Sequence, residues 1–117
     1  MKIESELLRG TGPLAVLKLL ERGEMYGYEL VEALAKRTDG VLALGQSTLY
    51  PLLYNLEAKG LIEGVWREAS AADGGRSRKY YRLTGAGKKR LAADTKQWLA
   101  LSGAMTALGL SPKEVRA

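Results

Sequence analysis

The side chains of this chain that could do chemistry are mainly basic, and they gather in one segment. Residues 64–90 hold eight of the 18 Lys and Arg residues and two of the 13 acidic residues, a net charge of +6. The basic residues are Arg67, Arg76, Arg78, Lys79, Arg82, Lys88, Lys89 and Arg90. Because a concentrated basic segment attracts polyanions, we expect nucleic acid as the partner. A solvated charged face and an acidic membrane surface are the alternatives, although the segment lacks the apolar helical face that membrane binding needs.

Enzymatic chemistry lacks its usual residues. The chain has no Cys and no His, which excludes disulfides, thiolate nucleophiles, Cys-ligated zinc and His-dependent triads. Residues 85–89 resemble a phosphate-binding loop, but Arg82 stands where its first Gly belongs and Lys89 where Ser or Thr belongs. The acidic residues are scattered along the chain. We therefore expect no enzymatic activity, no cofactor and no metal site.

The length and composition predict one globular domain. The chain has 117 residues, of which 46% are apolar and 26% charged, as in folded proteins of this size. No apolar stretch is long enough to span a bilayer, and no signal-peptide pattern opens the sequence. We expect a soluble, cytoplasmic protein.

The elements that must position the basic segment follow from apolar spacing and turn residues. Thr11 is predicted to cap a first helix that has Pro13 in its first turn, and further helical patterns run over residues 26–38 and from Gln46 or Ser47 to about residue 60. Residues 41–44 are predicted to be extended, as a minor strand. Two strand-like runs, 61–68 and 78–83, predict a hairpin with a Gly- and Ala-rich tip. The predicted fold is mainly α with a small β-hairpin. This order of elements predicts a winged helix-turn-helix domain over residues 7–83.

In such a domain the third helix buries its leucine stripe and presents the opposite face to the major groove. Amides and hydroxyls on that face can read base edges or phosphates. The candidates off the stripe are Gln46, Ser47, Thr48, Tyr50, Tyr54 and Asn55. For Ser47 the alternative is a helix N-cap, for Tyr54 it is packing beneath the wing, and for the others it is an ordinary exposed position.

A last helix is predicted from Thr84 to about residue 108, with the remaining residues, 111–117, as a tail of unassigned role. Its apolar side chains repeat at heptad a and d spacing: Leu91, Trp98, Leu101, Met105 and Leu108. The helix would be ~37 Å long at ~1.5 Å per residue, longer than the rest of the domain can cover. We therefore predict a dimerisation helix over residues 84–110. The alternative is a helix that lies on the core of its own domain.

Trp98 is the basis of a ligand-binding hypothesis. A twofold interface brings equivalent residues together, so two indoles beside small residues such as Ser102 could frame a slot for a flat apolar or aromatic effector. The alternative is that Trp98 only fills the dimer interface.

Four sequence blocks at matching spacing resemble the PadR-like transcriptional regulators, over about residues 7–100. They are MYGYEL (25–30), STLYPLL (47–53), LEAKGLI (56–62) and GGRSRKYYRLT (74–84). The resemblance implies a homodimeric DNA-binding repressor that responds to small molecules or stress. The chain departs from the family pattern at Gly12-Pro13, where a bulky aliphatic residue is common, so the start of the first helix is open.

The resemblance also implies roles for single residues. Ser47, Thr48 and Tyr50 match the start of the family's recognition helix. Arg76, Arg78 and Lys79 match its basic wing, which reaches the minor groove or flanking phosphates. Tyr26 and Tyr28 match its paired tyrosines, of which we expect one ring in the core and one hydroxyl near a phosphate; Tyr28 is counted among the DNA-binding residues.

These observations predict a sequence-specific transcriptional repressor that binds a pseudo-palindromic operator as a homodimer. Phosphate contacts are expected from the wing and from Lys88, Lys89 and Arg90. The alternative is a winged-helix module that docks an acidic protein through the same basic segment.

Overall fold

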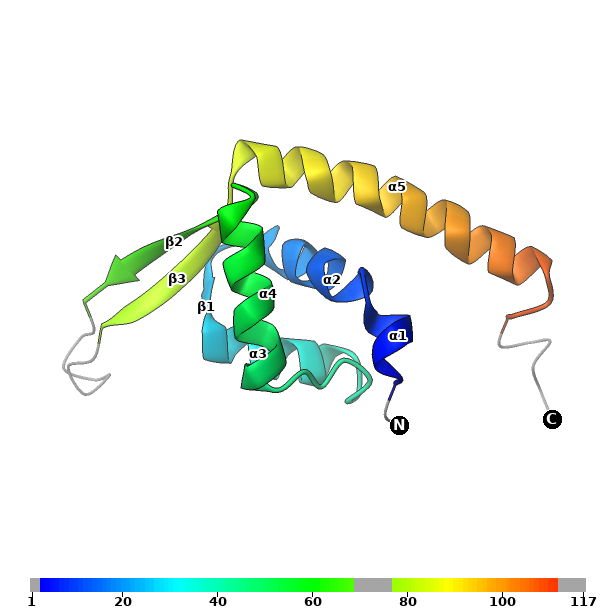
Figure 1. The fold of residues 1–117 in the computed structure, drawn as a ribbon, viewed down its shortest axis with the longest axis horizontal. Helices are drawn as coiled ribbons and strands as arrows, with labels where there is room; N and C mark the ends of the chain where they lie inside the picture. The colour runs from blue at the N-terminus through cyan, green and yellow to red at the C-terminus, as the bar shows by residue number, and fades with distance from the viewer. Residues whose placement is uncertain (1–2, 69–76, 112–117) are drawn as a thin grey trace.

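The computed structural model describes residues 3–68 and 77–111 of the chain. The elements are α1 (Ser5–Leu8), α2 (Thr11–Leu20), β1 (Met25–Tyr26), α3 (Gly27–Arg37), α4 (Gln46–Ala58), β2 (Ile62–Arg67), β3 (Arg78–Leu83) and α5 (Gly85–Ala107). Figure 1 shows a body of α2, α3 and α4, a β2–β3 wing that projects to the left, and α5 running along the top of the body and beyond it. The predicted mainly α winged helix-turn-helix architecture is confirmed.

The core lies where α2, α3 and α4 meet. Leu17, Leu30, Leu49 and Leu53 are fully buried there. On α4 the buried leucines recur at helical spacing, so one face of the helix is held by the core and the opposite face is left to solvent. This burial fixes α4 rigidly enough to present side chains outward.

The sheet has three strands in the order β1-β3-β2, all antiparallel. The predicted hairpin is confirmed, and β1 is added to it through the pairs Met25↔Tyr81 and Tyr26↔Tyr80. A strand of two residues carries too little alternation to be recognised from its sequence.

The predicted minor strand at residues 41–44 is wrong. Residues 41–42 belong to a turn and residues 43–44 to no regular element. Thr38 holds the turn, because its hydroxyl accepts a hydrogen bond from the backbone N–H of Leu42 at 2.9 Å. It also donates to the carbonyl of Leu34 at 2.5 Å. With its backbone bonded to the end of α3, the segment has no neighbouring strand among the described residues.

The start of α2 also differs from the prediction. The N-cap is Gly10, in the left-handed conformation at φ 87°, and Thr11 is the first helical residue. The Thr11 hydroxyl donates to the carbonyl of Leu8 at 2.8 Å and so links α2 to α1.

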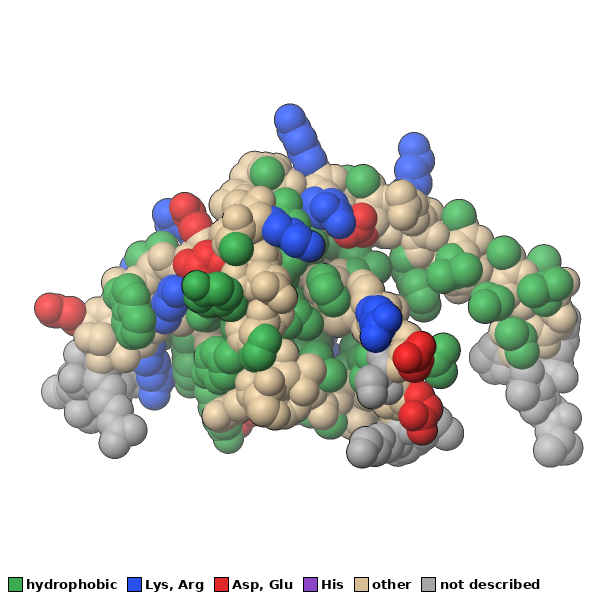
Figure 2. All heavy atoms as spheres, in the orientation of Figure 1, with side chains coloured by type: hydrophobic (Ala, Val, Ile, Leu, Met, Phe, Trp, Pro, Cys, Tyr) green, Lys and Arg blue, Asp and Glu red, His purple; other side chains and the backbone are tan. Residues whose placement is uncertain are grey.

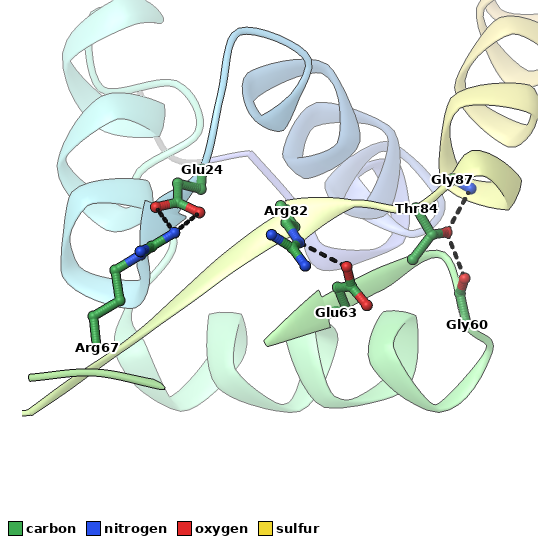
Figure 3. Close-up of polar contacts among 7 residues, drawn as sticks. All are labelled: Glu24, Gly60, Glu63, Arg67, Arg82, Thr84 and Gly87. Atoms are coloured by element: carbon green, nitrogen blue, oxygen red, sulfur yellow. Dashed lines mark hydrogen bonds and ion pairs between the residues drawn. The ribbon is translucent and has the colours of Figure 1, made fainter. Parts of the chain in front are cut away.

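Thr84 begins α5, as predicted, and joins it to the end of α4. Its hydroxyl accepts a hydrogen bond from the backbone N–H of Gly87 at 3.0 Å and donates to the carbonyl of Gly60 at 2.6 Å (Figure 3). The first half of α5 packs against α2, whereas its second half extends beyond the body (Figure 1). The molecule is accordingly elongated, 53 × 30 × 22 Å.

Within the described ranges, no helix is both long and apolar enough to cross a bilayer. Nor do the described residues contain a cluster of three or more acidic side chains that could hold a metal ion.

Candidate nucleic-acid interface

The outward face of α4 is polar and uncharged. The predicted recognition residues on it are all exposed: Gln46, Ser47, Thr48, Tyr50, Tyr54 and Asn55. Figure 2 shows little charge over the middle and lower part of this helix, with Lys and Arg side chains on its flanks and acidic side chains beside its upper end. Such a surface can hydrogen-bond to base edges while cations beside it contact phosphates.

Ser47 is not the N-cap of α4. The cap position is taken by Gly45, and no side chain caps the helix. Ser47 therefore lies in the first turn with its side chain exposed, and its hydroxyl is not held by the capping role.

The tyrosines differ in how far the protein holds them. Tyr54 is 73% exposed, so it does not pack beneath the wing. Tyr50 lies against the start of α3, where a Cβ on Gly27 would come within 2.5 Å of the Tyr50 hydroxyl oxygen. Gly27 thus provides the space that the Tyr50 ring needs, and Tyr50 connects α4 to α3 while it remains partly exposed.

The paired tyrosines at the start of α3 do not divide as predicted, because neither ring lies in the core. Tyr26 packs edge-on against Tyr80, with 5.5 Å between ring centroids. Tyr28 is exposed, and a hydrogen bond with the Glu32 side chain raises the pKa of its phenol. Tyr28 is therefore the more exposed of the two, and its hydroxyl lies beside the Glu32 carboxylate.

On the sheet face that carries Tyr26 and Tyr80, the arginines of the wing are held over aromatic rings. The Arg78 guanidinium lies 4.4 Å from the centroid of Tyr26, and that of Arg67 lies 5.8 Å from Tyr80. Arg67 also pairs with Glu24 at 2.7 Å (Figure 3). Cations stacked in this way are oriented by the protein.

Across the hairpin, Arg82 pairs with Glu63 at 2.6 Å (Figure 3). In the other ion pair, between Arg67 and Glu24, the hydrogen bond from Arg67 lowers the pKa of the Glu24 carboxyl below its ordinary value. Arg76, predicted for the wing, lies outside the described residues.

Lys79 faces the other way. Its ammonium lies 3.0 Å from a carboxylate oxygen of Glu57 on α4 and 5.4 Å from the ring of Tyr81. The hydrogen bond to Glu57 raises the pKa of Lys79. The predicted phosphate ligand is thus engaged by α4 of its own chain.

The residue that sequence reasoning missed is Trp66. It is 68% exposed on β2 and is the cross-strand neighbour of Lys79, so its indole shares the sheet face that meets α4. An exposed tryptophan on the wing is a candidate contact. No spacing in the sequence indicates which face of the wing it occupies.

The second basic cluster lies at the opposite end of α4 from Ser47. Lys88 and Lys89 are exposed in the first turns of α5, which Thr84 anchors to the C-terminal end of α4. Arg90 pairs with Asp94 at 3.0 Å. The 13 residues of α4 separate this cluster from the helix start by about 20 Å.

The predicted dimer seam requires one correction. Leu91 is 4% exposed and belongs to the core of its own chain, because this part of α5 lies on α2. From Trp98 onward the seam is exposed: Trp98 45%, Leu101 54%, Met105 43% and Leu108 79%.

Ser102, predicted beside Trp98, is half-buried on the same side of α5. Leu99, outside the predicted seam, is also exposed. An open groove of about 970 Å³ lies between α1, α2, α4 and the start of α5. Its lining includes Leu8, Leu52 and Arg90 but neither Trp98 nor Ser102.

The buried stripe of α4, its exposed polar face and the β2–β3 wing define a winged helix-turn-helix protein. In this class the second helix of the helix-turn-helix motif reads DNA. Comparison with known proteins gives the family: the chain belongs to the transcriptional regulator PadR-like family, whose model matches residues 16–93. Members are DNA-binding regulators of transcription without enzymatic activity, so the chain is a regulator and not an enzyme.

Individual relatives are similar to this chain over most of its length. An uncharacterized protein of Lysinibacillus sphaericus is 35% identical over 96 residues, 82% of this chain and 85% of the relative. A transcriptional regulator from Clostridium thermocellum superposes with a TM-score of 0.79 at 28% identity, covering 90% of this chain and 96% of that one. A PadR family regulator from Eggerthella lenta gives a TM-score of 0.74 at 36% identity, covering 91% and 88%.

Proposed function

We propose that this protein is a sequence-specific transcriptional repressor that binds a pseudo-palindromic operator as a homodimer. The observation that carries the proposal is the exposed, uncharged polar face of α4, held by the buried leucines behind it and flanked by basic side chains. As a regulator of transcription it would act where the chromosome is, in the cytoplasm.

In this proposal residues 7–83 form the DNA-binding domain, and α4 enters the major groove. Base edges are read from the first turns of the helix and from its exposed outer side, and Tyr28 and the wing arginines contact phosphates. Trp66 lies along the duplex beside the helix. The proposed contacts are Tyr28, Gln46, Ser47, Thr48, Tyr50, Tyr54, Asn55, Trp66, Arg76 and Arg78.

The homodimer is supported by the second half of α5, within residues 84–110. Leu91, Trp98 and Met105 recur every seven residues and so fall on nearly the same side of the helix. In the first half of α5 that side is buried on α2, and in the second half it is exposed. A second copy related by a twofold axis would cover this stripe and set two α4 helices one DNA turn apart, about 34–36 Å, or a multiple of it.

An effector would act on the same interface. Trp98 and Ser102 from both copies would line a slot for a small apolar or aromatic molecule, bound by stacking. Such a molecule releases the operator only if it binds more tightly to a dimer whose α4 spacing does not match the two half-sites.

The test is selection of bound sequences from a pool of random duplexes, followed by anisotropy titration of a labelled selected duplex at several salt concentrations. We expect an enriched pseudo-palindrome. If about three cations per copy contact phosphates, the log–log salt slope is about −5. Binding to an acidic polypeptide without sequence enrichment among the duplexes would favour an acidic-protein docking module and overturn the proposal.

A further inference from the structure

One basic residue of the wing, Lys79, is turned inward toward α4. The Lys79 ammonium and the Glu57 carboxylate are 3.0 Å apart, and their side chains are 29% and 31% exposed. Lys79 comes from β3 and Glu57 from the last turn of α4. The pair therefore joins the element that would read bases to the element that would reach the flanking phosphates.

The wing is shaped to let Lys79 make this contact. The stem of Lys79 runs across β2 at Gly64, where a Cβ would overlap Cε of Lys79 and come within 3.0 Å of the other Glu57 oxygen. Beneath it lies the ring of Tyr81, which is itself 7% exposed and part of the core. A residue without a side chain, a buried ring and a carboxylate thus enclose one lysine on three sides.

The charge of Glu57 also matters for DNA binding. A carboxylate on a recognition helix repels phosphates, and a half-buried carboxylate without a partner costs more than an exposed one. Lys79 neutralises it in place. Conversely, an ammonium held at 3.0 Å by a carboxylate is a poor phosphate ligand, because it would have to leave one anion to meet another.

From this geometry we propose that Lys79 is a positioning residue: with Glu57 and Gly64 it fixes the wing on α4, so that helix and wing reach adjacent grooves together. The inference rests on the proposed DNA-binding function and replaces a direct phosphate contact for Lys79. A wing freed from α4 must be ordered when DNA binds, which weakens binding.

The two roles predict different results for three single variants in the anisotropy assay. If Lys79 is a positioning residue, Lys79→Met, Glu57→Gln and Gly64→Ala each weaken binding of the selected duplex by about tenfold, and the salt slope stays that of the wild type. If Lys79 contacts a phosphate, Lys79→Met lowers the magnitude of the slope by about 0.9 per copy. Glu57→Gln then tightens binding because it frees the ammonium.

Gly64→Ala is the sharpest of the three, because it changes no charge. Its Cβ would meet the far end of a flexible side chain, so Lys79 is displaced while the strand persists; Ala is otherwise favoured over Gly in a strand. Lys96→Met, which removes an exposed lysine of α5, is the matched control for loss of one positive charge. Thermal unfolding of each variant identifies any that fails to fold.

The double variant Glu57→Gln/Lys79→Met completes the cycle. Residues that act as one unit are not additive, so we expect the double variant to bind as weakly as either single variant. Additive losses, a lowered salt slope in Lys79→Met, or wild-type binding by a folded Gly64→Ala would overturn the positioning role while the proposed function stands. Absence of duplex binding by the wild-type chain would overturn the proposed function and the positioning role with it.

Discussion

At the scale of single residues, burial separates side chains that look equivalent in the sequence. Leu91 and Leu101 both occupy the predicted heptad seam of α5, yet Leu91 is 4% and Leu101 54% exposed. The difference depends on how far along α5 the packing against α2 extends, and a heptad pattern in the sequence does not indicate this.

Substitution of these two leucines by Ala should therefore affect different properties, the stability of the fold for Leu91 and self-association for Leu101. Leu91→Ala removes buried methyl groups from the monomer and should destabilise the fold by about 2–5 kcal/mol at any protein concentration. Leu101→Ala should leave the fold nearly intact and weaken self-association. Urea unfolding and sedimentation equilibrium measure the two effects, and equal destabilisation by both variants would contradict this assignment.

At the scale of elements, the ends of helices join the body of α2, α3 and α4 to α5. Thr84 both caps α5 and bonds to the carbonyl of Gly60 after α4, so one hydroxyl fixes the angle between two helices. Loss of an N-cap side chain costs typically about 1 kcal/mol.

We expect Thr84→Ala to lower the free energy of unfolding by about 1–2 kcal/mol, because both hydrogen bonds are lost. Thr84→Ser keeps the hydroxyl and should retain most of the stability. Urea denaturation of both variants gives the comparison. Equal stability of the Ala and Ser variants would show that the junction does not depend on this hydroxyl.

The elements also show how far the sequence could predict the structure. The leucine stripe of α4, the hairpin and Thr84 as the start of α5 were all predictable, because each follows from local periodicity or a local cap. The third strand, β1, was not, since its pairing with β3 depends on a contact between residues 25–26 and 80–81, far apart in sequence.

The site was predictable to a smaller extent. The outward set on α4 follows from its buried stripe, so residue type and spacing were sufficient. The direction of Lys79 and the exposure of Trp66 depend on which face of the sheet meets α4, and alternation along a strand leaves that choice open.

At the scale of the whole molecule, the resolved pKa shifts all point away from neutral pH. The chain also has no His, the side chain that ordinarily titrates near neutrality. The pKa of Glu24 is lowered by Arg67, so this pair stabilises the fold above the ordinary Glu pKa and is lost as the pH falls through the lowered value. The pKa of Lys79 is raised by Glu57, so that stabilisation is present below the ordinary Lys pKa and is lost only as the pH rises through the raised value.

Stability and DNA affinity should therefore be nearly constant between pH 6 and pH 7. Arg67→Gln should remove part of the stability that the wild-type chain has at neutral pH, with a difference that disappears in acid. Thermal unfolding across the acid range measures this. A steep change in wild-type affinity between pH 6 and pH 7 would require a titrating group that the described residues do not provide.

The elongated shape of the molecule makes operator spacing the most direct test of the proposed dimer. In each copy α4 lies in the compact body while the exposed stripe of α5 lies beyond it, so two copies joined through that stripe hold their α4 helices at a fixed separation. Insertion of five base pairs between the half-sites turns one of them by about half a DNA turn, and a rigid dimer can then fill only one half-site.

We expect this insertion to weaken binding at least tenfold in the anisotropy assay, because the contacts of one copy are lost. Leu101→Ala/Met105→Ala should bind both spacings equally weakly, since monomers do not sense the separation. Equal affinity of the wild-type chain for the two spacings would mean that the copies bind independently, and α5 would then need another partner.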